Sequence, residues 1–285
     1  MNQTADSRQR TADQGSRARI VLRPLSAVCR LLSAEKIMTI LFLAIAPAAF
    51  AGDGAVSLSP ASVMLRGRTG ESASQTLTMR NGTSRPMSFD VLAQDVVVQN
   101  GKRVMKPAGA IAGSIAATAV FSTRHITVPS GGSASVTMTV TVPPNATPRA
   151  VVALFKGTDL IMRGKAASTA SLGSLMTFAL SDDIALKPEP LIVKPQSATS
   201  NLSVAQTFVN SGHEPVVARG MLALIGADGR LAGKAPLAPK RLLPGERAEL
   251  GTQYAGEIAP GHYRVLVTYE YEGRNLIQSS EVDVK

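Results

Sequence analysis

Histidine is the side chain most often used for proton transfer and metal binding near neutral pH. The chain holds three, at His125, His213 and His262. None of them has a second His or a Cys at the spacing of a zinc site. His213 follows the turn residue Asn210, and His262 adjoins Gly261, so we expect both on surface turns. The sequence therefore predicts no metal site.

Two pairs of carboxylates lie close together, as a general acid and a general base would. Asp182 and Asp183 are adjacent, which places them on opposite faces of a strand, whereas Glu270 and Glu272 share one face. Both pairs are typical of solvated strand ends. The sequence has no Gly-x-Ser-x-Gly, no His-Glu-x-x-His and no Gly-rich phosphate loop. We therefore expect no catalytic residue, no cofactor and no enzymatic activity.

The first 51 residues have the features of an export signal. The apolar run Ile37–Phe50 is shorter than the roughly 20 residues that span a membrane. It follows the basic residues Arg30 and Lys36 and ends in Ala49-Phe50-Ala51, the small-residue pattern of a cleavage site. We predict a signal peptide cut after Ala51, export to a bacterial periplasm and a mature chain without a transmembrane segment. An uncleaved membrane anchor is the alternative.

Removal of this leader would leave a moderately basic chain without cysteine. The single cysteine, Cys29, lies in the leader, so no disulfide is available and packing alone must stabilise the mature protein. Seven of the 30 basic and three of the 20 acidic residues also lie there, which leaves 23 against 17 and a net charge of +6. Basic and aromatic residues do not alternate as they do in nucleic-acid-binding proteins, so we expect no nucleic acid partner.

Alternating apolar and polar residues predict strands throughout the remaining sequence. The segment 136–142 alternates Val and Met with Thr, and the segments 76–80 and 87–91 alternate in the same way. Asn100-Gly101 is the residue pair most typical of a two-residue hairpin turn. Pro60 interrupts the first apolar segment, which indicates an edge strand or a change of sheet.

A turn pattern occurs twice and predicts a duplicated domain. Asn81 precedes Pro86 by five positions, and Asn210 precedes Pro215 by the same number. Tyr263, just after a Pro-Gly turn, matches the tyrosine corner of immunoglobulin-like domains. We predict an all-β chain of two tandem immunoglobulin-like β-sandwiches after the signal peptide. The predicted domains are residues 52–186 and 187–285, preceded by the leader, residues 1–51.

The pattern of strands and turns resembles that of the periplasmic chaperones of pilus (fimbrial) assembly. The resemblance covers most of the first domain and implies two sandwiches with a groove between them. It also implies that an edge strand pairs with an unfinished pilus-type subunit, with an outer-membrane assembly protein as a further partner. It rests on the segments Ala55–Leu58, Leu77–Val91, Ser135–Val142 followed by Pro143-Pro144, and Leu175–Leu180 before Lys187-Pro188.

One feature of that family is missing. Its members anchor the carboxylate of the subunit with an Arg on the first strand and a Lys on the last strand of domain one. Here Ser59-Pro-Ala-Ser62 and Ser181-Asp-Asp183 occupy the corresponding places. Three nearby basic residues are candidates to replace the two anchors in binding the partner, namely Arg66, Arg68 and Lys156.

Strand pairing with a partner requires a free edge and no polar motif. The Thr-rich strand 136–142 and the strands on either side of the loop 157–173 are the candidate edges. The leading prediction is a chaperone-like protein that caps or delivers secreted subunits. The alternative is a structural or adhesive module of the cell envelope that binds glycan or peptidoglycan.

Overall fold

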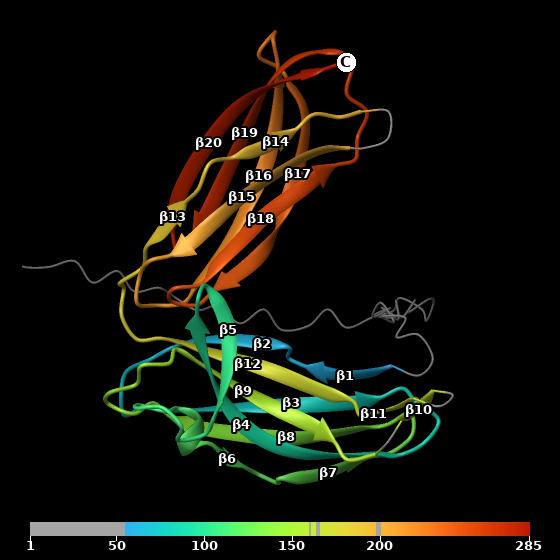
Figure 1. The fold of residues 1–285 in the computed structure, drawn as a ribbon, viewed down its shortest axis with the longest axis vertical. Helices are drawn as coiled ribbons and strands as arrows, with labels where there is room; N and C mark the ends of the chain where they lie inside the picture. The colour runs from blue at the N-terminus through green and yellow to red at the C-terminus, as the bar shows by residue number, and fades with distance from the viewer. Residues whose placement is uncertain (1–54, 160, 164–165, 198–200) are drawn as a thin grey trace, which may run out of the picture. The chain divides into compact units, whose positions relative to one another are not determined.

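The computed structural model describes residues 55–159, 161–163, 166–197 and 201–285, which are mostly strand (Figure 1). The predicted signal peptide and its cleavage site after Ala51 lie outside the described residues. The one helical element among the described residues is a single 3-10 turn, η1 (Ala116–Thr118). No helix in this part of the chain is long and apolar enough to cross a membrane. The predicted all-β class is confirmed.

The first sandwich consists of two sheets packed around one core. One sheet has the order β1-β3-β8-β6, and the other has the order β2-β12-β9-β4-β5 with β7 also paired to β4. A short ribbon of β10 and β11 lies between β9 and β12 in the chain. The bounds are β1 (Val56–Ser59), β2 (Ser62–Arg66), β3 (Ser72–Asn81), β4 (Met87–Gln99), β5 (Lys102–Pro107), β6 (Val120–Phe121), β7 (His125–Val128), β8 (Ser133–Thr141), β9 (Ala150–Gly157), β10 (Ile161–Arg163), β11 (Ala166–Ser168) and β12 (Ser171–Ala179).

Pro60 marks a change of sheet, one of the two roles predicted for it. Before it, β1 pairs antiparallel with β3 in one sheet. After it, β2 pairs parallel with β12 in the other sheet. The peptide bond between Ser59 and Pro60 is cis. The first two strands, on either side of Pro60, therefore belong to different sheets of the sandwich.

The β3–β8 pair shows how the alternation of residues divides core from surface. Leu77 and Met79 on β3 and Met138 on β8 are fully buried. The positions between them point outward and carry hydroxyl side chains, which bond across the two strands at 2.7–3.1 Å. These cross-strand pairs are Ser72–Thr141, Ser74–Thr139, Thr76–Thr137 and Thr78–Ser135.

The second sandwich has a core of its own and two further sheets. One sheet has the order β13-β15-β14 with β18 also paired to β15, and the other has the order β17-β16-β19-β20. In the core the rings of Phe208 and Tyr269 pack edge to face with their centroids 4.7 Å apart. The bounds are β13 (Leu186–Pro188), β14 (Ile192–Lys194), β15 (Leu202–Asn210), β16 (Val216–Gly226), β17 (Leu231–Leu242), β18 (Arg247–Tyr254), β19 (Gly261–Tyr271) and β20 (Arg274–Val284).

The tyrosine corner is present in the second sandwich. The Tyr263 hydroxyl donates a hydrogen bond to the carbonyl oxygen of Ala259 at 2.8 Å. This is the bond that a tyrosine corner makes with the backbone a few residues upstream. The prediction drawn from the Pro-Gly turn is confirmed.

The two copies of the repeated turn are built in the same way. Asn81 is fully buried, and its Nδ2 donates to the carbonyl of Arg85 at 2.8 Å and to that of Val128 at 3.1 Å. Asn210 is also fully buried, and its Nδ2 donates to the carbonyl of Glu214 at 2.8 Å and to that of Leu242 at 3.1 Å. Each Asn therefore closes its turn onto a strand end of the same sandwich.

The predicted division between residues 186 and 187 stays a prediction. Ile184 and Leu186 pack in the core of the second sandwich, and the last residue of the first core is Phe178. A smaller apolar cluster contains Val96 and Val152 from the first sandwich and Leu243 from the second. The two cores are thus separate, with a few apolar contacts between them.

Candidate functional site

The three basic residues expected to bind a partner do not form one site. Arg66 ends β2 and forms ion pairs with Asp182, at 3.5 Å, and with Glu272. Arg68 lies exposed in the following loop, where its backbone N–H donates to the carboxylate of Glu71. Lys156 lies exposed on β9.

Arg66 and Lys156 lie near opposite ends of β12. Arg66 lies opposite Ala179, and Lys156 lies opposite Ser171, eight residues away. At ~3.3 Å per residue the two positions are about 26 Å apart. The two side chains therefore cannot bind the same carboxylate.

An unpaired strand edge lies at the start of β12. β9 pairs with residues 171–177, whereas β2 pairs only with residues 175–179. β1 belongs to the other sheet and pairs with β3. Residues 171–173 thus have a partner strand on one side and none on the other among the described residues, whereas Ser174 is buried and its hydroxyl donates to the carbonyl of Pro60 at 2.7 Å. β12 is one of the two strands on either side of the segment 157–173, which the sequence indicated as candidate edges.

The orientation of the backbone along this edge follows from one hydrogen bond. The N–H of Leu175 points to the β2 side and donates to the carbonyl of Ala61 at 3.0 Å. In a strand, the backbone N–H and C=O groups of successive residues point to opposite sides. The backbone groups of Gly173 and Ser171 therefore point to the same side as those of Leu175. They are available to a further strand placed in line with β2.

The Thr-rich strand, the other candidate edge, is not free over its last residues. β6 pairs with Thr139 and Met138 of β8. The N–H of Ser122 donates to the carbonyl of Thr137 at 2.9 Å, and the hydroxyl of Thr118 donates to the carbonyl of Thr141 at 2.8 Å. The expectation of an open edge on this strand is therefore wrong for residues 137–141, because the segment 118–122 covers it.

A basic pocket of about 330 Å³ begins where the open edge of β12 ends. Ser62 and Leu175, the first residues that pair β2 with β12, form part of its wall. The facing wall comes from the end of β17 in the second sandwich. The lining residues are Ser62, Arg103, Leu175, Pro239, Lys240, Arg241 and Glu246.

The pocket holds three cationic side chains and one carboxylate. Nε of Arg103 donates to Glu246 at 3.0 Å, and its Nη2 donates to the carbonyl of Arg241 at 2.6 Å. Nε of Arg241 is buried and has no hydrogen-bond partner among the described residues. Burial, followed by the nearby charge of Arg103, lowers the pKa of Arg241. An anion in this pocket would offset both effects.

Glu214 bonds the two sandwiches to each other. Its side chain is 1% exposed and accepts from Nε of Arg149 at 3.0 Å, from the N–H of Leu180 at 3.0 Å and from the hydroxyl of Ser181 at 2.8 Å. Another bond between the sandwiches runs from the N–H of Arg247 to the carbonyl of Gly101 at 3.2 Å. Arg247 follows the pocket residue Glu246, and Gly101 is two residues before Arg103, so this bond joins the two walls of the basic pocket.

The residues of the pocket gave only weak signals in the sequence. Lys240 and Arg241 are adjacent basic residues near a strand end, and Arg103 follows the predicted Asn100-Gly101 hairpin. The hairpin turn is present, with positive φ at both residues. Arg103 and Arg241 are 138 residues apart in the sequence. The strands predicted from the sequence do not indicate that these two residues come into contact.

The histidines lie at the surface, and each contacts a carboxylate. Nδ1 of His125 lies 2.9 Å from Asp90, and His213 contacts Asp183. His213 lies in the turn after Asn210, as expected, whereas His262 is the second residue of β19. Among the described residues, no three His, Cys, Asp or Glu side chains are grouped so that they could hold a metal ion.

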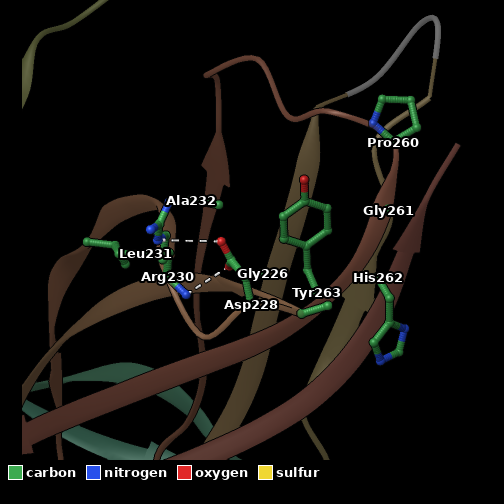
Figure 2. Close-up of a pocket in the computed structure, with 10 residues that line it drawn as sticks. Gly226, Asp228, Arg230, Leu231, Ala232, Pro260, Gly261, His262 and Tyr263 are labelled. Atoms are coloured by element: carbon green, nitrogen blue, oxygen red, sulfur yellow. Dashed lines mark hydrogen bonds and ion pairs between the residues drawn. The ribbon is translucent and has the colours of Figure 1, made fainter.

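A second cavity, of about 430 Å³, lies at the other end of the second sandwich, between the β16–β17 turn and the start of β19 (Figure 2). Asp228 accepts from the N–H of Arg230 at 3.0 Å and closes the turn. Tyr263 and His262 are neighbours on β19 and point in different directions in Figure 2. The polar groups of this cavity do not converge on one point, so it offers no constellation for catalysis.

His262 provides a test of the electrostatics at this end of the chain. The hydrogen bond that Nδ1 of His262 donates to the carboxylate of Asp283 at 2.8 Å raises the pKa of His262, and Glu281 adds a smaller contribution. The stabilisation from this contact is complete below the unfolded-state pKa of about 6.5 and is lost as the pH rises through the higher folded-state pKa. We expect the ring of His262 to titrate above its ordinary range when followed by NMR. Asp283→Asn should lower the pKa of His262 more than Glu281→Gln, and equal effects would contradict this.

Comparison with known proteins finds similarity only to solved structures. No family model matches the chain, and no curated protein matches it. The class 5 fimbriae chaperone CfaA is 13% identical, with 79% of this chain and 99% of that chain covered and a TM-score of 0.42. The CupB2 chaperone of Pseudomonas aeruginosa is 12% identical, with 80% and 100% covered and a TM-score of 0.35. The E. coli chaperone DraB is 14% identical, with 81% and 97% covered and a TM-score of 0.35. The assignment of two immunoglobulin-like sandwiches rests on the strands and cores described above.

Proposed function

We propose that the chain is a non-enzymatic, periplasmic, chaperone-like protein that binds the C-terminal segment of a secreted or pilus-type subunit by strand pairing. The observation that carries the proposal is the open edge of β12 at residues 171–173, which leads towards the basic pocket. Backbone hydrogen bonds along such an edge supply affinity without any polar side-chain motif. An outer-membrane assembly protein as a further partner belongs to the same proposal.

The direction of the bound segment follows from β2. β2 runs parallel to β12, and a segment in line with β2 would continue that pairing towards residue 171. If it also runs parallel to β12, its C-terminal end lies beside Ser62 and Leu175, at the pocket. An antiparallel segment would place its N-terminal ammonium there.

The charge of the pocket selects between these two directions. Lys240, Arg241 and Arg103 outnumber the single carboxylate of Glu246. A terminal carboxylate would be attracted, and the three cationic side chains that line the pocket could donate charge-assisted hydrogen bonds to it. A terminal ammonium would be repelled. Of the three sequence-predicted basic residues, Lys156 lies beside the far end of this edge, opposite Ser171, on the neighbouring strand β9.

The test uses one synthetic peptide with alternating apolar residues, prepared with a free C-terminal carboxylate and with a C-terminal amide. We expect the carboxylate form to bind at least tenfold more tightly by calorimetry, because a charged hydrogen bond contributes about 1.5–3 kcal/mol. Lys240→Ala should remove most of this difference. Lys234→Ala, on the same strand but outside the pocket lining, should preserve it.

Separate variants test the strand pairing at the open edge of β12. Ser171→Pro removes one N–H that points to the open side, at the first residue of the strand, where proline is tolerated. It should weaken both peptides, whereas Ser171→Ala should bind as the wild type does. Equal affinity for the two peptides would exclude the carboxylate pocket. Failure to bind either peptide, together with sedimentation on purified cell walls, would favour the envelope-adhesion alternative over strand capture.

A further inference from the structure

The outer face of the sheet β17-β16-β19-β20 carries a band of apolar side chains that crosses all four strands. Side chains on one face of a strand alternate, so residues opposite each other in the ladder form rows. Met221 is 43% exposed and Ile277 is 60% exposed, although both lie in the middle of their strands. The two central rows are Pro236, Met221, Thr268 and Ile277, and then Lys234, Ala223, Leu266 and Ser279.

Charged residues of both signs lie at the two ends of this band. At one end, Arg219 and Glu270 form an ion pair with 2.7 Å between Nη2 and Oε1. At the other end, Arg264 of β19 lies opposite Glu281 of β20. Lys234 lies on the edge strand β17, so its charge also belongs to the rim of the band. An apolar centre with a charged rim is the usual composition of a protein–protein interface.

We propose that a second copy of this chain packs on this outer face, related by a two-fold axis that lies in the interface and runs across the strands. Such an axis would pass between residues 266 and 268 of β19, between 221 and 223 of β16 and between 277 and 279 of β20. Each strand then faces the same strand of the second copy and runs antiparallel to it. This places the axis midway between the two central rows of outward-facing residues.

The shapes of the two faces fit under this symmetry. Met221 faces the partner's Ala223, and Leu266 faces the partner's Thr268. Ile277 faces the partner's Ser279. At each of these positions a larger side chain lies against a smaller one, as in packed sheets whose side chains interdigitate about 10 Å apart.

The charges also fit. Glu270 and Arg264 lie three residues on either side of the axis on β19, so Glu270 faces the partner's Arg264 twice in the dimer. The rim would therefore carry two pairs of opposite charge and no pair of like charge at these positions. Complementary rim charges fix the register of an interface more than they raise its affinity.

The size of the face sets the expected strength. Four strands about 4.8 Å apart, with four outward residues about 6.8 Å apart on each, cover roughly 500 Å² per copy. Stable interfaces bury about 800 Å² per partner, and transient ones bury less than about 600 Å². We therefore expect a reversible dimer whose population depends on the protein concentration.

Sedimentation velocity of the purified full chain over a range of concentrations tests the proposal. The wild type should shift from monomer to dimer as the concentration rises. Met221→Asp and Ile277→Asp should each remove the dimer, because each buries two carboxylates in the apolar centre. Val120→Asp, at an exposed apolar position on the first sandwich, should leave the dimer unchanged.

A charge exchange tests the symmetry itself. Arg264→Glu and Glu270→Arg should each weaken the dimer, and the double variant should recover it. Circular dichroism of every variant shows whether the fold is retained. A wild type that is monomeric at every concentration, or a dimer that survives Met221→Asp in a folded protein, overturns the proposal. The outer face and the open edge of β12 lie on different sheets, so this result is independent of the peptide-binding test.

Discussion

Glu214→Ala is expected to lower the free energy of unfolding by about 3–5 kcal/mol, the usual result of removing one partner from a buried ion pair. Nε of Arg149, the N–H of Leu180 and the hydroxyl of Ser181 all donate to this carboxylate. The Arg149 side chain is only 17% exposed, so the variant leaves a largely buried cation without an anion. Urea denaturation followed by circular dichroism measures the change.

Two further variants separate charge from packing at this position. Arg149→Met combined with Glu214→Leu removes both charges together and should cost much less than Glu214→Ala alone. Glu189→Ala breaks an exposed ion pair with Arg247 and should change stability little. A Glu214→Ala variant as stable as the Glu189→Ala variant would show that the buried contact contributes nothing.

Asn210→Ala is expected to lower the free energy of unfolding by about 2–4 kcal/mol, because it leaves buried backbone groups without partners at roughly 1–3 kcal/mol each. The carbonyls of Glu214 and Leu242 lose this donor, and the N–H of Gly212 loses one of its two acceptors and keeps the carbonyl of Ala185. Amide hydrogen exchange should rise in this turn of the second sandwich. Urea denaturation gives the overall change.

Asn81→Ala is the matched variant in the first sandwich, where the same side chain bonds to Arg85, Val128 and the N–H of Thr83. It should cost a similar amount, with the rise in amide exchange confined to the first sandwich. Asn145→Ala, at an exposed position, serves as the control and should change little. A large loss for only one of the two buried asparagines would show that the two turns are not equivalent.

The fold could be predicted because its signals are local. The alternation of Leu77 and Met79 with hydroxyl residues defines a strand and its buried face, and this needs only neighbouring residues. The Asn100-Gly101 turn needs positive φ at two adjacent residues, and those residue types supply it. The repeated Asn indicated a repeated turn, and both copies have the same hydrogen bonds.

The candidate site could not be predicted because its contacts are not local. Arg103 approaches Arg241 only because a hairpin of the first sandwich lies beside β17 of the second. Arg66 looked suitable as an anchor from its place in the sequence, yet Asp182 and Glu272 neutralise it. The free edge of β12 depends on where β2 begins, and the identity of the residues in β12 does not reveal that.

The two buried asparagines have a consequence for how a duplicated chain can change. Each Asn holds the residue four positions later through its backbone carbonyl, so the side chain at that position is not needed to form the turn. In the first copy the residue is Arg85, which is exposed, and in the second it is Glu214, which is buried against the first sandwich. A position of this kind lets one substitution create a bond between two copies while each copy retains its own fold.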